Sequence, residues 1–202
     1  MINYVVKRDG SKEKFDPSKL TKWAEWASVV GVDWFAVVTE AYKRCHDGTT
    51  TAELHDALIK SCIDLETSQS LLMAGRLEVG RLHRQVFGGI EQFPSLKQFY
   101  KEMVKKGFYA ELGYTDAELD YLGTVIDHTQ DFNLSHTQIL QDIQKYLMSD
   151  MTTKQPLETP QFALMRQAMG AHHIQPKDRR LDDVVNMYRD LVEGLVNTPT
   201  LS

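Results

Sequence analysis

The most constraining feature of this sequence is a tight-turn signal between two short apolar stretches near the N-terminus. Asp9-Gly10 predicts a two-residue type I′ turn, because both central residues of that turn need a positive φ, which Gly adopts without strain. Apolar residues stand at alternate positions before the turn, at Ile2, Tyr4 and Val6, and Phe15 follows it. This alternation predicts two short, half-buried strands that pair as a β-hairpin.

A helix start follows the hairpin directly. Asp16 can cap this helix, and Pro17 can take its first position, where a missing N–H costs nothing. Four basic residues stand in the same stretch: Lys7, Arg8, Lys14 and Lys19. A hairpin that leads into a helix N-terminus beside several cations is chemically suited to a polyphosphate. An ordinary surface turn next to lysines is the alternative reading of this stretch alone.

The spacing of apolar residues predicts successive helices up to about residue 90. The first helix ends near Gly31, and its apolar stripe consists of Leu20, Trp23, Ala27 and Val30. A second helix covers about 34–45, and the capping box Thr50-x-x-Glu53 opens a third. A fourth covers about 70–86. One hairpin with four helices predicts a small domain over residues 1–90.

The second half of the chain also has helical spacing. We expect helices at about 96–107, 115–126, 139–147, 159–170 and 181–195, with Gly170 as the stop of the fourth. Thr115-x-x-Glu118 is another capping box. The predicted fold class is therefore mainly α. Residues 197–202 look like the opening of a new element, which suggests a fragment of a longer protein.

The composition is that of a soluble, globular, cytoplasmic protein. Of 202 residues, 42% are hydrophobic and 25% charged, and no apolar run is long enough to span a bilayer. The N-terminus becomes charged too early for a signal peptide. A net charge of −5 argues against a general nucleic-acid surface but allows a local basic pocket. Cys45 and Cys62 lack a metal-ligand pattern, and we expect both to be reduced and buried.

Several segments resemble the large (alpha) subunit of class I ribonucleotide reductase. Residues 6–20, 50–55 and 76–88 match its N-terminal ATP-cone in order and spacing. Residues 126–131 resemble the family's Ile-Asp-His-x-Arg-Asp segment, with Gln130 in place of the Arg. Residues 109–118, 144–147 and 158–162 are similar to later stretches, and 198–201 to the first strand of the reductase barrel. The resemblance covers essentially the whole chain.

The resemblance implies three parts: an ATP-cone over 1–90, a helical N-terminal domain over 91–196, and the truncated start of a barrel strand over 197–202. It implies an allosteric site for ATP as activator or dATP as inhibitor, with Mg²⁺ accompanying the phosphates. The residues of this site would be Lys7, Arg8, Glu13, Lys14, Phe15, Asp16, Pro17, Ser18, Lys19, Thr51, His55 and Arg84. Thr51 stands at a helix start, where free N–H groups favour an anion. Thr200 matches a residue that contacts the substrate's diphosphate.

The chemistry of individual side chains suits these implied roles. Glu13 and Asp16 offer acceptors for an adenine amino group. Lys19 and Arg84 can hold phosphate charge, and His55 can contact the sugar.

The resemblance places the catalytic cysteines beyond Ser202, so we expect no catalytic residue in this chain and no reductase activity from it alone. The implied partners are the remainder of the large subunit, the radical-generating small subunit and further copies in a homo-oligomer, with neither nucleic acid nor membrane. We expect an exposed apolar surface for association around four residues: Phe162, Met165, Leu191 and Leu195.

Three other functions are compatible with parts of the pattern. A free-standing adenine-nucleotide sensor or adaptor would need no enzymatic partner. A nucleotide-responsive transcription repressor also carries an ATP-cone, but that family places a four-cysteine zinc ribbon before it, and no CxxC occurs here. The third is an unrelated all-α interaction module, which would not bind adenine nucleotides.

Overall fold

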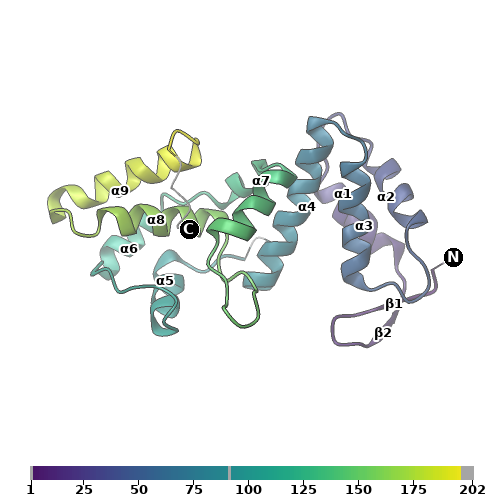
Figure 1. Ribbon diagram of the computed structural model, residues 1–202, viewed down its shortest axis with the longest axis horizontal. Helices are drawn as coiled ribbons and strands as arrows, with labels where there is room; N and C mark the ends of the chain where they lie inside the picture. Colours follow the sequence, from purple (N-terminus) through teal and green to yellow (C-terminus); the bar gives the residue numbers. More distant parts are fainter. Residues whose placement is uncertain (1, 91, 197–202) are drawn as a thin grey trace. The chain divides into compact units, whose positions relative to one another are not determined.

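The computed structural model describes residues 2–90 and 92–196, and they form two compact units (Figure 1). Unit 1 comprises the chain up to Arg81 together with Phe132–Leu140, and unit 2 comprises Leu82–Asp131 and the chain from Gln141 onward. The described residues are mainly helical with an antiparallel hairpin, as the sequence predicts. The predicted division at residues 90 and 196 stays a prediction, and 197–202 lie outside the described residues.

The elements follow one another closely in both units. Unit 1 contains β1 (Tyr4–Val6), β2 (Lys12–Lys14), α1 (Pro17–Trp26), α2 (Trp34–Lys43), α3 (Thr51–Ile63) and most of α4 (Ser68–Phe87). Unit 2 contains α5 (Leu96–Lys105), α6 (Asp116–Gly123), the π-helix η2 (Asp142–Tyr146), α8 (Pro160–His172) and α9 (Lys177–Val192). The 3-10 helix η1 (His128–Asn133) and α7 (His136–Gln141) cross from one unit to the other along the chain.

The hairpin loop differs from the predicted type I′ turn. Of its central residues only Gly10 has a positive φ, of 82°, so the prediction for Asp9 is wrong. The Gly10 N–H donates to Lys7 O (2.9 Å) and the Lys7 N–H to Ser11 O (2.8 Å). The Asp9 carboxylate accepts from the Ser11 N–H and hydroxyl, which stabilises this wider turn. The loop is therefore a three-residue connection that ends on a left-handed glycine.

The buried side of β1 also differs from the prediction. Val5 is buried together with Ile2, whereas Tyr4 and Val6 are only half-buried. Val5 points toward the helices of unit 1, so its two neighbours must point to the other face. The predicted alternation through Ile2, Tyr4 and Val6 is therefore wrong.

The predicted helix starts are confirmed. The Asp16 carboxylate accepts from the Ser18 N–H at 2.9 Å, and Pro17 is the first residue of α1. Both halves of the capping boxes at Thr50 and Thr115 are present. These caps depend on residues two or three positions apart, so the sequence shows them directly.

Two predicted helix ends are wrong. The first helix ends at Trp26 rather than near Gly31, and Val30 lies in the following loop with 95% of its surface exposed. The eighth helix passes Gly170 and continues to His172. A glycine stops a helix when it adopts a left-handed conformation, and Gly170 keeps a helical one.

Close contacts to a helical glycine fix the segment at 132–140 in unit 1. A Cβ at Gly75 would lie 2.1 Å from the backbone oxygen of Leu134 and 2.8 Å from the carbonyl carbon of Ser135. Arg76 on the same helix donates to Phe132 O (3.2 Å) and Ser28 O (2.6 Å). The backbone of this segment therefore packs directly on α4.

We expect Gly75→Ala to destabilise unit 1 by about 2 kcal/mol, because the methyl group meets backbone atoms that cannot rotate away. Gly170→Ala is the matched control: it is also helical and has open space around the added Cβ, but it lies in unit 2 and should leave the stability of unit 1 unchanged. All three tryptophans lie between residues 23 and 34, so denaturation followed by tryptophan fluorescence reports on unit 1. Equal stability of the two variants in that signal would contradict the packing described here.

Unit 2 has a separate core, in which α8 and α9 lie side by side (Figure 1). Phe162 and Met165 are almost completely buried in it, and Leu191 is 8% exposed. The predicted apolar association surface is therefore wrong for these three residues, because they are buried in the core of unit 2. Leu195 is exposed, at 71%, beyond the end of α9.

Two hydrogen-bonded pairs of polar side chains lie within unit 2. His83 Nε2 lies 2.8 Å from Asp131 Oδ2, and neither side chain is exposed. Arg180 Nη2 lies 2.5 Å from Glu118 Oε1 and joins α9 to α6. In the described ranges, no helix is both long enough and apolar enough to cross a membrane.

Candidate functional site

Lys7 and Lys19 converge on the carboxylate of Glu13 in unit 1. Lys7 Nζ lies 3.0 Å from Glu13 Oε2, and Lys19 Nζ forms a short ion pair with Oε1. Hydrogen bonds from Lys19 and then Lys7 lower the pKa of Glu13, and the bond to Glu13 raises the pKa of Lys19. Two cations from different elements are thus held around one anionic position.

The register of the hairpin separates its basic residues into two groups. Val5 pairs with Glu13, while Tyr4 pairs with Lys14 and Val6 with Lys12. Because side chains alternate along a strand, Lys12 and Lys14 project from the face opposite to Glu13. The Lys12 ammonium lies 4.8 Å from the centre of the Tyr4 ring. The structure therefore does not bring Lys14 to the Glu13 cluster, and its role stays a prediction.

The N-terminus of α3 lies beside the end of β1 (Figure 1). The Val6 N–H donates to Thr49 O at 3.2 Å, and Val6 forms a bridge with Thr50. The capping box uses the N–H of Glu53, whereas the N–H groups of Thr51 and Ala52 make no hydrogen bond within the described residues. These free donors, with Lys7 next along the chain from Val6, favour an anion at this place.

Asp47 holds β1 against this helix start, a role that the sequence did not reveal. Its carboxylate accepts from the Asn3 N–H (2.6 Å), the Asn3 amide (2.9 Å) and the Tyr4 N–H (3.2 Å). The Gly48 N–H then donates to Tyr4 O. Asp47-Gly48 resembles an ordinary turn, and no local pattern indicates a partner more than forty residues away.

Residues 15–18 connect the hairpin to α1 and fix the start of that helix. Phe15 is buried, with its ring centre 5.4 Å from that of Tyr42. Asp16 uses one carboxylate oxygen for the cap on Ser18, and Pro17 starts α1. These contacts orient the first turn of α1, from which Lys19 reaches Glu13.

His55 lies on the inner side of α3. Its Nε2 is 2.9 Å from Leu77 O, and its ring centre is 4.9 Å from that of Trp23. A carbonyl oxygen only accepts, so Nε2 carries the hydrogen. Burial lowers the pKa of His55, which favours the neutral ring and leaves Nδ1 as an acceptor. An acceptor suits a sugar hydroxyl, although contact with a sugar stays a prediction.

The remaining predicted residues are more scattered. Arg8 is exposed in the hairpin loop, and Arg84 stands in the last turns of α4, in unit 2. Thr200 lies outside the described residues. The roles of all three stay predictions.

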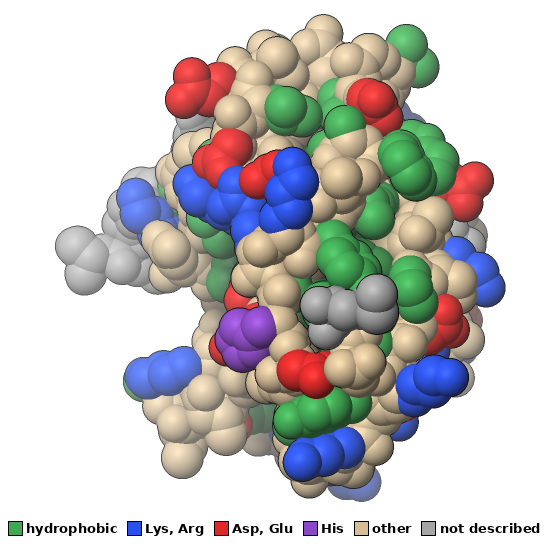
Figure 2. Space-filling view, turned by 90° about the vertical axis from the view of Figure 1, so that its right-hand side faces the viewer, with side chains coloured by type: hydrophobic (Ala, Val, Ile, Leu, Met, Phe, Trp, Pro, Cys, Tyr) green, Lys and Arg blue, Asp and Glu red, His purple; other side chains and the backbone are tan. Residues whose placement is uncertain are grey.

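One face of the molecule carries charges of both signs. Figure 2 shows Lys and Arg side chains next to Asp and Glu side chains on the visible face, rather than a continuous basic area. The ion pairs of Glu13 with two lysines fit this picture. The two lysines that pair with Glu13 therefore favour a discrete anion site over a diffuse basic surface.

The two cysteines differ in burial. Cys62 is buried, and burial raises the pKa of its thiol to about 12. Cys45 is half-buried, and burial raises its pKa as well. Both therefore remain protonated thiols near neutral pH.

The chain is similar in sequence to known proteins. Residues 3–85 match the family model described as the ATP cone domain. The chain is 31% identical over 207 residues to the ribonucleoside-diphosphate reductase subunit alpha of Enterobacteria phage T4, and 28% identical over 204 residues to ribonucleoside-diphosphate reductase 1 subunit alpha of Escherichia coli K12. These alignments cover 99% and 97% of this chain.

A third relative is the ribonucleoside-diphosphate reductase subunit alpha of Buchnera aphidicola from Acyrthosiphon pisum, at 30% identity over 98% of this chain. The chain spans about a quarter of the length of these relatives, 27% in each case. It contains an ATP cone and is homologous to the N-terminal region of ribonucleoside-diphosphate reductase alpha subunits.

Proposed function

We propose that this chain is the regulatory portion of a ribonucleoside-diphosphate reductase alpha subunit, and that it binds ATP as activator or dATP as inhibitor. The observation that carries the proposal is the convergence of Lys7 and Lys19 on one anionic position, next to the free N–H groups at the start of α3. Cations and a helix N-terminus together form a chemically suitable site for a polyphosphate.

The proposed site holds a nucleotide in two parts. Lys7, Lys19 and the N–H groups of Thr51 and Ala52 bind phosphate oxygens. When the phosphates bind the two lysines in place of Glu13, the Glu13 carboxylate can accept a hydrogen bond from the adenine amino group. The proposed set also includes further residues of unit 1: Arg8, Phe15, Asp16, Pro17, Ser18, His55 and, on the other face of the hairpin, Lys14. Arg84 belongs to unit 2, and its part in the site is proposed from the family resemblance alone.

Mg²⁺ is proposed to arrive with the nucleotide. Among the described residues, no group of three His, Cys, Asp or Glu side chains is arranged to hold a metal ion. Mg²⁺ commonly uses phosphate oxygens and water as most of its ligands, so the effector itself can supply them.

The assembly is proposed from the relatives, which are named as alpha subunits of the reductase. The proposed partners are the remainder of the large subunit, with its catalytic cysteines and substrate site, a radical-generating small subunit, and further copies of the same subunit. Reduction of ribonucleotides is then a property of the assembled enzyme, which this chain regulates.

Nucleotide binding must displace Glu13 from both lysines, because two anions cannot share these cations without repulsion. We therefore expect Glu13→Gln to bind inorganic tripolyphosphate several-fold more tightly than the unsubstituted chain, on the order of 3- to 10-fold. The same variant should lose preference for ATP over GTP, since adenine presents an amino donor where guanine presents an oxygen. Competition titrations with both nucleotides and tripolyphosphate measure the two effects.

Glu25→Gln is the matched control, because Glu25 is an exposed acid on α1. It removes the same charge and should leave tripolyphosphate affinity and base preference nearly unchanged. Weaker or equal tripolyphosphate binding by Glu13→Gln would contradict the exchange of anions at this position.

A further inference from the structure

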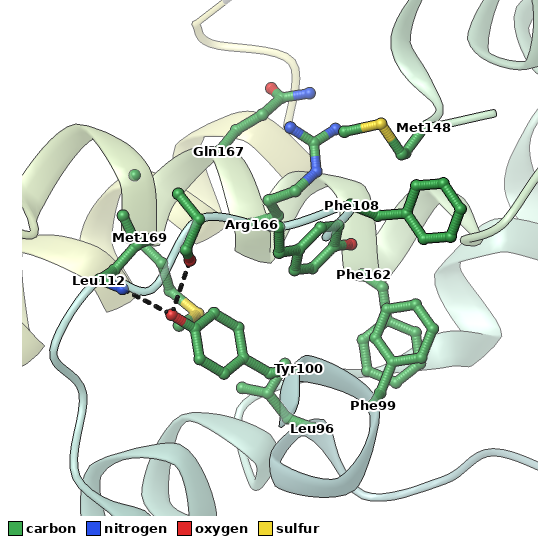
Figure 3. Close-up of a pocket in the computed structure, with 13 residues that line it drawn as sticks. Leu96, Phe99, Tyr100, Phe108, Leu112, Met148, Phe162, Arg166, Gln167 and Met169 are labelled. Carbon is green, nitrogen blue, oxygen red and sulfur yellow. Dashed lines mark hydrogen bonds between the residues drawn. The ribbon is translucent and has the colours of Figure 1, made fainter. Parts of the chain in front are cut away.

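A cavity lies in unit 2, among α5, the segment that follows it and α8 (Figure 3). It has a volume of about 260 Å³. An apolar cavity of about 150 Å³ already holds benzene, so this one has room for a bicyclic ring system. Its walls are mostly rings and aliphatic side chains, among them Leu96, Phe99, Tyr100, Leu112, Phe162 and Met169.

The walls of this cavity are held in place by contacts of their own. The rings of Phe99 and Phe162 are stacked with centres 4.3 Å apart. The Tyr100 hydroxyl donates to Ala110 O (3.0 Å) and accepts from the Leu112 N–H (2.8 Å), as the dashed lines in Figure 3 show. A cavity with such fixed walls needs little rearrangement to accept a ligand.

One charged group lines the cavity, and its charge is already compensated. Arg166 donates from Nε and Nη2 to the two oxygens of Glu158, at 3.1 and 2.8 Å, and Nη2 also reaches Tyr146 O. Glu158 is completely buried. These bonds leave donors on Nη1, so a ligand can place one acceptor there.

The charge balance restricts the class of ligand. Glu158 offsets the charge of Arg166, and the other walls are apolar, so several negative charges would lose their hydration without compensation. A nucleotide polyphosphate is therefore excluded from this cavity. An aromatic compound with a single hydrogen-bond acceptor can pack against the apolar walls and accept from Arg166.

We propose that this cavity is a binding site for a small bicyclic aromatic compound that carries one uncharged hydrogen-bond acceptor, such as a carbonyl oxygen, which accepts from Arg166. The site is separate from the proposed nucleotide site and does not depend on it.

Titration of the purified chain with 2-naphthamide, an uncharged bicyclic compound with one carbonyl acceptor, tests this proposal, with ligand fluorescence or ligand-observed NMR as the signal. We expect saturable binding of one molecule per chain with a Kd below about 1 mM, the strength reached by small ligands of this size. Addition of ATP should not displace the probe.

Gly170 provides a way to fill the cavity. It lines the cavity on α8, and an added Cβ would meet nothing within 4 Å. Gly170→Leu should therefore weaken 2-naphthamide binding at least about 10-fold while the chain stays folded by circular dichroism. Ala171→Leu adds a similar side chain at the next, exposed position and should bind the probe like the unsubstituted chain. Absence of saturable binding, or equal binding by both variants, would overturn the proposal.

Discussion

Replacing Lys19 by alanine is expected to weaken dATP binding roughly 10- to 100-fold, the loss typical of one charge-assisted phosphate contact. Lys19 reaches the Glu13 position from the first turn of α1, so its ammonium group is placed to meet phosphate when Glu13 is displaced. Raising the salt concentration should weaken the unsubstituted chain more than the variant, because the variant has lost one screened interaction. Calorimetric titration at two salt concentrations measures both effects.

Lys12→Ala is the matched control for Lys19→Ala. Lys12 carries the same charge as Lys19, but it lies on the face of the hairpin opposite to Glu13, over the Tyr4 ring. Its removal should change dATP affinity little. Equal losses for the two variants would indicate a diffuse basic surface, and no loss for either would place the nucleotide elsewhere on the chain.

Glu118→Gln is expected to destabilise unit 2 by about 3 kcal/mol at pH 7. Burial opposes ionisation of this group, but the Thr115 N–H and the Arg180 guanidinium outweigh it and lower the pKa of Glu118 to about 2. The glutamine keeps an acceptor for the capping box and removes only the charge, which leaves buried Arg180 without its counter-ion.

The pH dependence of this effect follows from the sign of the shift. The pKa in the folded chain lies below the ordinary value of 4.5, so ionised Glu118 contributes its full stability above about pH 4.5. That contribution is lost as the pH falls from 4.5 toward 2. Urea denaturation followed by circular dichroism should therefore separate the variant from the unsubstituted chain at pH 7 and bring them together near pH 2.

Glu102→Gln serves as the control for the charge change. Glu102 pairs with Lys106 on an exposed helix face, where an ion pair contributes little. This variant should be nearly as stable as the unsubstituted chain at pH 7. A difference between Glu118→Gln and the unsubstituted chain that is the same at pH 2 and pH 7 would contradict the assigned role of the ion pair.

Local features of this fold could be read from the sequence, because their causes are local. Asp16 and Pro17 start α1, and the capping boxes at Thr50 and Thr115 open two further helices, all through bonds within three residues. The hairpin loop was harder to predict. Asp9 binds Ser11 through its side chain, and this stabilises a wider turn than Asp9-Gly10 alone indicates.

Contacts between distant residues could not be predicted from a single sequence. Asp47 holds Asn3, and His83 is buried against Asp131, over separations of 44 and 48 residues. Val30 continues an apolar stripe in the sequence, but its helix has ended at Trp26, so it points into solvent.

The candidate site was predicted from a family resemblance more than from spacing. The structure brings Lys7, Lys19 and Glu13 together, but no sequence pattern indicates that Glu13 forms ion pairs with both lysines. Lys14 is adjacent to Glu13 in the sequence, but the alternation of side chains along the strand places it on the other face of the hairpin.

Calorimetric titration of the unsubstituted chain with ATP and with dATP shows directly whether the proposed site in unit 1 binds adenine nucleotides. The proposed site predicts saturable binding of both nucleotides and weaker binding of GTP. It also predicts that tripolyphosphate competes with the nucleotides for the two lysines that pair with Glu13. Absence of saturable binding at millimolar ATP and dATP, in a chain that circular dichroism shows to be folded, would contradict it.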